Sequence, residues 1–266
     1  MSLLLSCLIL GGLFYPVTIF AKTTVENSEG LLKRLDRTIE EKTSLRLRYL
    51  NNLQQLKSKA VEQKGEKLIE TYQQLFRAYA HFQSDSALAY LDLIEENVKD
   101  SKRAFELLQW TRIGRAEVYG IMGLYKSAAN LLENTSVSAD QASLQLYYYQ
   151  VARSVYGWMA DYGEVGENRK VLQQLTASYR DSILQVETNP TNRAIVQADK
   201  LLNEGNLQNA REVCLRALGH ADSLQHAYLY ALLADIAEAS NNHDDYLYYL
   251  CLAALSDLER GVTEYR

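Results

Sequence analysis

The sequence predicts an all-α protein: antiparallel helix pairs preceded by a long N-terminal amphipathic helix. Only 2 Pro and 13 Gly occur in 266 residues, whereas a β-sandwich or barrel needs a turn signal about every 8–12 residues. Apolar residues recur at spacings of three and four, which is the period of a helix. Short polar turns separate these periodic stretches, so long helices with tight connections fit the sequence best.

The N-terminal residues have the character of a cleavable export signal. No charge precedes Lys22, and a compact apolar stretch ends in the small residue Ala21, as at a signal-peptidase site. The alternative is an uncleaved membrane anchor, because about 20 apolar residues can span a bilayer. A signal predicts a periplasmic or cell-envelope location. The chain then divides into a signal peptide at 1–21, an N-terminal helical segment at 22–65 and a repeat domain at 66–266.

Helical periodicity continues from residue 29 almost to the end of the chain. Gly65 marks a first break, and Ser84-Asp85-Ser86 is typical of a helix N-cap. Pro190 follows Asn189 and opens a later helix. The predicted helices are 29–58, 66–82, 86–98, 103–122, 126–133, 139–160, 167–185, 191–204, 207–218, 223–240 and 244–262.

Three stretches repeat one helix–turn–helix pattern. They are Ala116-x2-Tyr119-x3-Gly123-x-Tyr125-x2-Ala128-x3-Leu132, Ala198-x2-Leu201-x3-Gly205-x-Leu207-x2-Ala210-x3-Cys214-x2-Ala217 and the degraded Asn242-x4-Leu247-x3-Cys251-x2-Ala254. This is the tetratricopeptide pattern, with a period of about 34 residues. Small residues let two helices approach closely, and Gly at the turn adopts a positive φ. The pattern predicts a tetratricopeptide-like right-handed superhelix of about five pairs, including a divergent pair over 139–185.

Cys214 and Cys251 occupy equivalent places in consecutive repeats. Equivalent positions of stacked helices lie about 10 Å apart, whereas a disulfide requires Cα atoms within about 7 Å. We therefore expect two buried free thiols, even though an exported compartment permits disulfides.

The charged and chemically reactive residues do not form a recognisable site. A net charge of −5 argues against nucleic-acid binding, and the slightly basic stretch 29–70 lacks interleaved aromatic residues. The histidines, which form no helical zinc motif, are His81, His220, His226 and His243. Adjacent carboxylates such as Glu95-Glu96 point about 100° apart on a helix. We expect no enzyme, no metal and no cofactor; a clustered His/Asp/Glu pocket would revive the alternative of a helical enzyme.

Several stretches together resemble a known family in their order and spacing. They include Leu35-Asp36-x2-Ile39, Tyr72-x2-Leu75-Phe76-x2-Tyr79, Gly123-Leu124-Tyr125-Lys126-Ser127-Ala128, Tyr147-Tyr148-x3-Ala152-Arg153, Tyr179-Arg180-Asp181-Ser182 and Tyr248-Tyr249-x3-Ala253-Ala254. The chain resembles the extracytoplasmic half of Bacteroides-type transcriptional regulators with tetratricopeptide repeats, a domain of unknown function. The resemblance implies a periplasmic sensor, followed by a transmembrane helix, a cytoplasmic coiled coil and a helix-turn-helix DNA-binding end.

The sequence ends at Glu264-Tyr265-Arg266 without those later parts. Repeat arrays normally finish with a polar capping helix. The last predicted helix instead carries an apolar face with no following helix to cover it: Tyr248, Leu250, Leu252, Leu255 and Leu258. We therefore expect a truncated chain, which contacts a membrane only through an uncleaved N-terminal segment or a missing C-terminal span.

The first helix of each tetratricopeptide pair is expected to line a concave binding groove. On this register, the lining residues are Trp110, Ile113, Glu117, Ile121, Asn192, Ile195, Asp199 and Asn203. Their mixed character suits a short peptide or a partner helix. The tyrosine clusters at 147–149 and 246–249 fit either exposed peptide contacts or core packing.

These observations predict an exported helical-repeat module that binds a protein or peptide. A glycan-binding cell-envelope repeat protein and a non-functional truncated remnant are the alternatives. The amphipathic N-terminal helix also offers a surface through which two copies of the chain could pair.

Overall fold

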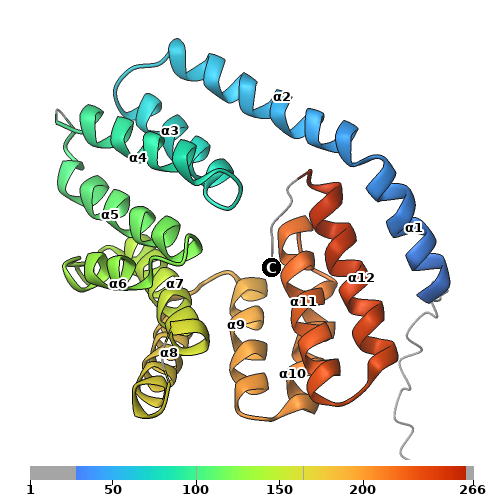
Figure 1. Ribbon diagram of the computed structural model, residues 1–266. Helices are drawn as coiled ribbons and strands as arrows, with labels where there is room; N and C mark the ends of the chain where they lie inside the picture. The colour runs from blue at the N-terminus through green and yellow to red at the C-terminus, as the bar shows by residue number, and fades with distance from the viewer. Residues whose placement is uncertain (1–27, 100, 164, 262–266) are drawn as a thin grey trace, which may run out of the picture.

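The computed structural model describes residues 28–99, 101–163 and 165–261. Every regular element in these residues is helical, which confirms the all-α prediction (Figure 1). The predicted signal peptide lies outside the described residues. The elements are α1 (Ser28–Glu40), α2 (Lys42–Val61), α3 (Glu66–Tyr79), α4 (Ser84–Asn97), α5 (Ala104–Ile121), α6 (Tyr125–Glu133), α7 (Ala142–Trp158), the π-helical turn η1 (Met159–Gly163), α8 (Glu167–Val186), α9 (Pro190–Asn203), α10 (Leu207–Leu218), α11 (Ser223–Ala239) and α12 (His243–Glu259).

Five helix pairs make up the array within the described residues: α3–α4, α5–α6, α7–α8, α9–α10 and α11–α12. They follow one another round an arc, with α3–α4 at one end and α11–α12 at the other (Figure 1). The right-handed superhelix stays a prediction. Close helix approach rests on the small residues of the repeat pattern, because four of them are fully buried: Ala116, Ala128, Ala198 and Ala210.

The turns inside the repeats need a left-handed backbone. Gly123 and Gly205 have φ values of 78° and 76°, as the repeat pattern requires. In the degraded third copy this role falls to Asn241, with φ 55°, rather than to Asn242. Asn tolerates the left-handed region better than most residues. Asn242 instead caps α12 by accepting a hydrogen bond from the Asp245 backbone N–H at 3.1 Å.

Local capping signals predicted some helix starts better than others. Pro190 opens α9, and the Asn189 side chain accepts hydrogen bonds from the backbone N–H groups of Thr191 and Asn192, as expected. The predicted cap at Ser84-Asp85-Ser86 is wrong, because α4 already begins at Ser84 and Gln83 precedes it without a side-chain cap.

The predicted helix at 29–58 is two helices, α1 and α2, with a break at Glu41. The Ser44 hydroxyl donates to the Glu41 carbonyl at 2.9 Å, a local bond that competes with regular helix geometry. The break lets the two helices contact opposite ends of the array, since α1 lies against α12 and α2 against α3 (Figure 1).

Helix α1 covers the apolar face of α12. In this α1–α12 seam, Leu31 and Leu255 are 1% and 2% exposed, Cys251 is buried, and Leu35 packs beside them. An ion pair between Arg34 Nη2 and Glu259 Oε1, 2.6 Å apart, flanks the seam. The expectation of an uncovered last helix is therefore wrong. The partner helix precedes the whole array in sequence, and the packing argument for a truncated chain does not hold.

The end of α12 also rests against α2. Gly261 has φ 73°, and a Cβ atom there would lie 2.7 Å from the Leu45 carbonyl oxygen. The Arg48 guanidinium donates to the Glu259 carbonyl at 3.3 Å. Helices α1 and α2 therefore connect the first pair of the array to the last.

Both expected free cysteines are confirmed as buried thiols without a disulfide. Burial raises the pKa of Cys214 to about 12 and also raises the pKa of Cys251. Because the thiolate is the reactive form, we expect neither thiol of protein lacking residues 1–21 to react with a maleimide under native, mildly alkaline conditions. Both should react after unfolding in urea. Equal labelling rates in the native and unfolded protein would contradict this burial.

Candidate functional site

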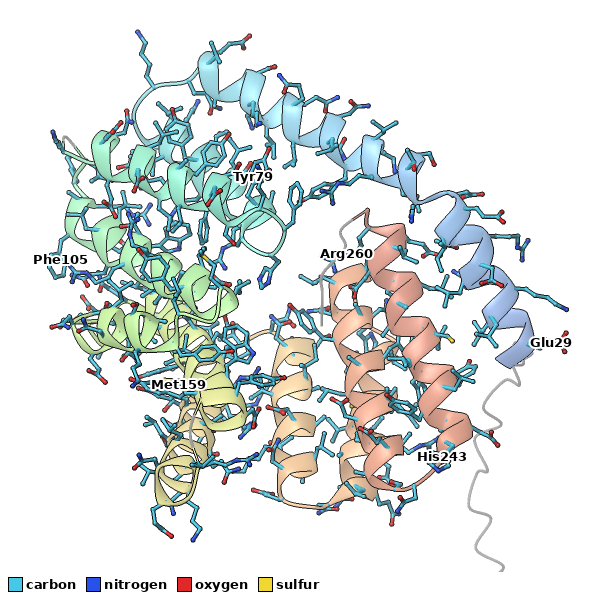
Figure 2. The ribbon with its side chains drawn as sticks, in the orientation of Figure 1. Glu29, Tyr79, Phe105, Met159, His243 and Arg260 are labelled. Carbon is cyan, nitrogen blue, oxygen red and sulfur yellow. The ribbon has the colours of Figure 1, made fainter. Side chains whose placement is uncertain are left out.

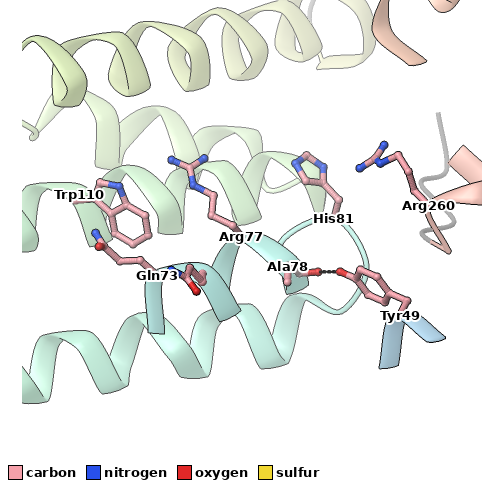
Figure 3. Close-up of a pocket in the computed structure, with 8 residues that line it drawn as sticks. Tyr49, Gln73, Arg77, Ala78, His81, Trp110 and Arg260 are labelled. Atoms are coloured by element: carbon pink, nitrogen blue, oxygen red, sulfur yellow. Dashed lines mark hydrogen bonds between the residues drawn. The ribbon is translucent and has the colours of Figure 1, made fainter. Parts of the chain in front are cut away.

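A cavity of about 690 Å³ opens where α2, α3, α5 and the end of α12 meet. This volume lies within the range of small-ligand sites. Figure 3 shows side chains from these separate helices facing one space. This inner cavity is lined by Tyr49, Gln73, Gln74, Arg77, Ala78, His81, Trp110 and Arg260.

Helix α3 forms one wall of the inner cavity, because its two faces differ in character. Phe76 is fully buried in the core, and its ring meets that of Trp110 edge-on, with centroids 5.2 Å apart. Gln73 and Arg77, one turn apart, face the cavity instead. The Tyr49 hydroxyl donates to the Ala78 carbonyl at 2.5 Å and fixes α2 against this wall (Figure 3).

A half-buried carboxylate, Glu117 on α5, lies beside the inner cavity. The Tyr147 hydroxyl donates to Glu117 Oε2 at 2.5 Å, and His81 Nε2 lies 3.6 Å from Oε1. Burial alone would raise the pKa of Glu117. The hydrogen bond from His81, the charge of Arg77 and the Tyr147 hydroxyl together hold this pKa below its ordinary value. Burial, and then the Glu117 charge, raise the pKa of Tyr147 well above its usual range.

The lowered pKa of Glu117 links stability to acid pH. A depressed folded-state pKa gives a stabilising contribution that is present above the unfolded pKa of 4.5 and is lost as the pH falls through the folded pKa. We expect Glu117→Gln to lack this contribution, so its deficit in unfolding free energy should shrink below pH 4.5. Urea midpoints at neutral and acid pH measure this. Glu238→Gln, at an exposed position of α11, is the control, and a deficit independent of pH would contradict the linkage.

The binding residues predicted on α5 have different environments. Trp110 lines the inner cavity. Glu117 lies next to it, with its oxygens engaged by Tyr147 and His81. Ile113 is fully buried in the core, and Ile121 is half-buried at the end of the helix.

The predicted residues on α9 hold helices together. Asp199 accepts hydrogen bonds from Arg153 Nη1 at 2.5 Å and Arg180 Nε at 2.7 Å, which join α9 to α7 and α8. The exposed Asn203 donates to the Asp199 side chain. Asn192 accepts from Gln225 Nε2 on α11 at 2.8 Å. Ile195 packs, half-buried, against the core of the last pairs. None of these residues lines the inner cavity.

Sequence reasoning missed most of the residues that line the inner cavity. Gln73 and Arg77 lie one turn apart on α3, on the side away from the buried Leu75, and His81 follows four residues later. This polar stripe was a signal that could have identified one wall. Arg260 lacked such a signal, because it reaches the cavity only when the end of α12 lies against α2 (Figure 3).

The tyrosine clusters take part in core packing. Tyr147 and Tyr249 are 4% and 8% exposed, and the other rings are half-buried. Tyr148 and Tyr149 both contact Tyr179, with ring centroids 6.1 Å apart in each pair.

The part of the chain that the structure describes contains neither a candidate metal-ion site nor a candidate membrane-spanning helix. It contains no group of three or more His, Cys, Asp or Glu residues placed to hold a metal ion. No helix among residues 28–261, outside positions 100 and 164, combines the length and apolar character needed to cross a membrane. Figure 2 shows side chains between the neighbouring helices of the array.

Comparison with known protein families matches residues 39–266 to the SusR N-terminal TPR domain, where TPR denotes the tetratricopeptide repeat. No curated protein and no solved structure matches the chain. The family match covers the whole array and α2, and it begins at residue 39, near the end of α1. The chain therefore belongs to the SusR N-terminal TPR domain family.

Proposed function

We propose that the chain is the extracytoplasmic sensor module of a membrane-bound transcriptional regulator and that it binds a peptide in its inner cavity. TPR domains generally mediate protein interactions, and the family is named for such a domain. The observation that carries the proposal is the inner cavity itself, which gathers side chains from both ends of the array.

The lining of the inner cavity suits a peptide. Gln73 and Gln74 carry amide groups that can both donate and accept hydrogen bonds, as pairing with a peptide backbone requires. Trp110 and Tyr49 add aromatic area beside them, and aromatic anchors dominate the energetics of many interfaces. The cavity is large enough for a few residues of an extended chain rather than for a folded partner.

The proposed periplasmic location rests on the predicted signal peptide at 1–21. Expression of the full chain in a Gram-negative host should release a mature protein that begins at Lys22. Fractionation and N-terminal mass measurement test this. Protein that keeps its intact N-terminus and stays in the cytoplasm would contradict the periplasmic location. Peptide binding is tested separately.

Site-specific photocrosslinking tests peptide binding in the inner cavity. A benzophenone amino acid replaces Gln73 on the cavity wall or, as a matched control, the exposed Gln208 on α10. Each protein is irradiated with a mixture of short random peptides, and adducts are identified by mass spectrometry. We expect a defined set of peptides at position 73 and none of that set at position 208. Identical adducts at both positions, or none at either, would contradict the proposed function.

A further inference from the structure

The helices divide into two units, and each hydrophobic core cluster of the described residues lies within one of them. The first unit comprises α2–α8, and the second comprises α1 together with α9–α12 (Figure 1). Phe76 and Ile113 belong to clusters of the first unit, whereas Leu229 and Leu255 belong to clusters of the second. Close-packed side chains hold their helices together, so each unit has an apolar interior of its own.

Within residues 28–261 the chain passes between the two units at two places. Glu41 separates α1 from α2, and residues 187–189 connect α8 to α9. Glu187 and Asn189 both have an extended backbone. Hinges are commonly a few residues at the ends of elements, where changes in φ and ψ are absorbed. The two crossings define a line about which one unit can rotate on the other while the chain stays intact.

Ion pairs join the units beside the second crossing. Asp199 on α9 accepts hydrogen bonds from Arg153 on α7 and Arg180 on α8. Lys200 Nζ lies 2.6 Å from Asp181 Oδ1 on α8. Long charged side chains can keep such contacts through small rotations by changing rotamer, whereas interdigitated apolar side chains transmit strain. This junction therefore tolerates a change of angle better than the interior of either unit.

The end of α12 meets the start of α2 beside the first crossing. A Cβ atom at Gly261 would lie 2.7 Å from the carbonyl oxygen of Leu45, which follows Glu41 by four residues. The Arg48 guanidinium donates to the Glu259 carbonyl. The units therefore approach each other closely here only because residue 261 has no side chain.

We propose that the array is a clamp whose two units rotate about the line through Glu41 and residues 187–189, so that the inner cavity opens and closes. Gln73 and Trp110 line the inner cavity from the first unit, and Arg260 lines it from the second. The angle between the units therefore sets the width of the cavity, and a ligand that contacts both walls selects one angle. Rotation occurs in the free protein, so the clamp goes beyond peptide binding and does not depend on it.

Distances between pairs of spin labels test the clamp on protein lacking residues 1–21. One pair joins the units, with Phe105→Cys on α5 and Gln208→Cys on α10. Val61→Cys with Phe105→Cys is the matched pair within the first unit, and Gln208→Cys with His243→Cys is that within the second. All four positions are exposed and the native thiols are buried, so the labels attach to the introduced cysteines. We expect a broader distance distribution for the pair between the units than for either pair within a unit.

Two further variants perturb the two crossings separately. Asp199→Asn removes the carboxylate charge that Arg153 and Arg180 share beside the second crossing. Gly261→Ala places a Cβ atom against the Leu45 carbonyl beside the first. Each variant should shift the mean distance between the units by more than about 2 Å, the scale of hinge movements, and leave the distances within the units unchanged.

Asp92→Asn is the matched control, because it removes an ion pair with Arg115 inside the first unit, whose atoms lie 2.8 Å apart. It should leave all three distances unchanged. Circular dichroism establishes that each variant is folded, and either crossing variant can report the rotation alone. Equal widths for the three wild-type pairs would overturn the clamp. So would the lack, in both crossing variants, of a shift that is confined to the pair between the units and absent from the control.

Discussion

Phe76→Ala is expected to lower the free energy of unfolding by about 3–5 kcal/mol, the usual effect of removing a fully buried Phe. The Phe76 side chain is 0% exposed. Packing around it is tight, because a Cβ atom added at Gly114 on α5 would lie only 2.9 Å from its ring. The edge-on contact with Trp110 is lost as well, so the same change should loosen the wall of the inner cavity.

Phe105→Ala provides the matched control for this prediction. Phe105 lies on α5 but is 64% exposed, so its truncation should change stability by no more than about 0.5 kcal/mol. Urea denaturation followed by circular dichroism measures both variants. Similar losses for the two would contradict the packing of α3 against α5.

Leu255→Ala carries the second large expected effect, a loss of about 2–5 kcal/mol in the free energy of unfolding. Leu255 is 2% exposed and lies in the α1–α12 seam with Leu31 and Cys251. Removing its side chain leaves a cavity between helices that are joined only by tertiary contacts. The change should therefore also increase hydrogen exchange of α1, which covers this face.

Leu250→Ala is the control on the same helix. Leu250 is 44% exposed. Its truncation should lower the free energy of unfolding by about 1 kcal/mol or less, because folding buries little of its apolar surface. An equal loss in the two variants, or unchanged exchange of α1 in Leu255→Ala, would show that α1 does not depend on this seam.

Local sequence signals predicted the helices of the array well. Helix α10 spans Leu207–Leu218 as expected, and α9 begins one residue before its predicted start. Asn189-Pro190 marks the start of α9, and Gly205 marks the turn between α9 and α10. No Gly or Pro near Glu41 indicates the break between α1 and α2. This break is important because α1 and α2 contact different ends of the array.

Contacts between distant parts of the chain explain what the sequence could not show. A repeat pattern describes how each helix pair packs on the next pair. It therefore predicted no partner for the last helix. The covering helix is α1, and Arg34 and Glu259 lie 225 positions apart in the chain. The residues of the candidate site also differ in whether they depend on contacts between distant parts of the chain. Trp110 follows from the register of its own helix, whereas Arg260 enters the inner cavity through the closure made by α2 and α12.

Carbodiimide crosslinking of Arg34→Lys tests the closure of the array by its N-terminal helix most directly. The reagent joins an amine to a carboxylate only when they are in contact, and Arg34 and Glu259 form an ion pair at 2.6 Å. Lys33 and Glu29, whose charged atoms are 2.7 Å apart within α1, serve as the internal positive control. An equal mixture of ¹⁴N- and ¹⁵N-labelled protein distinguishes crosslinks within one chain from those between two. We expect a crosslink between positions 34 and 259 within single chains. Its absence beside a strong Lys33–Glu29 crosslink, or its appearance only between differently labelled chains, would contradict closure of the array by its own N-terminal helix.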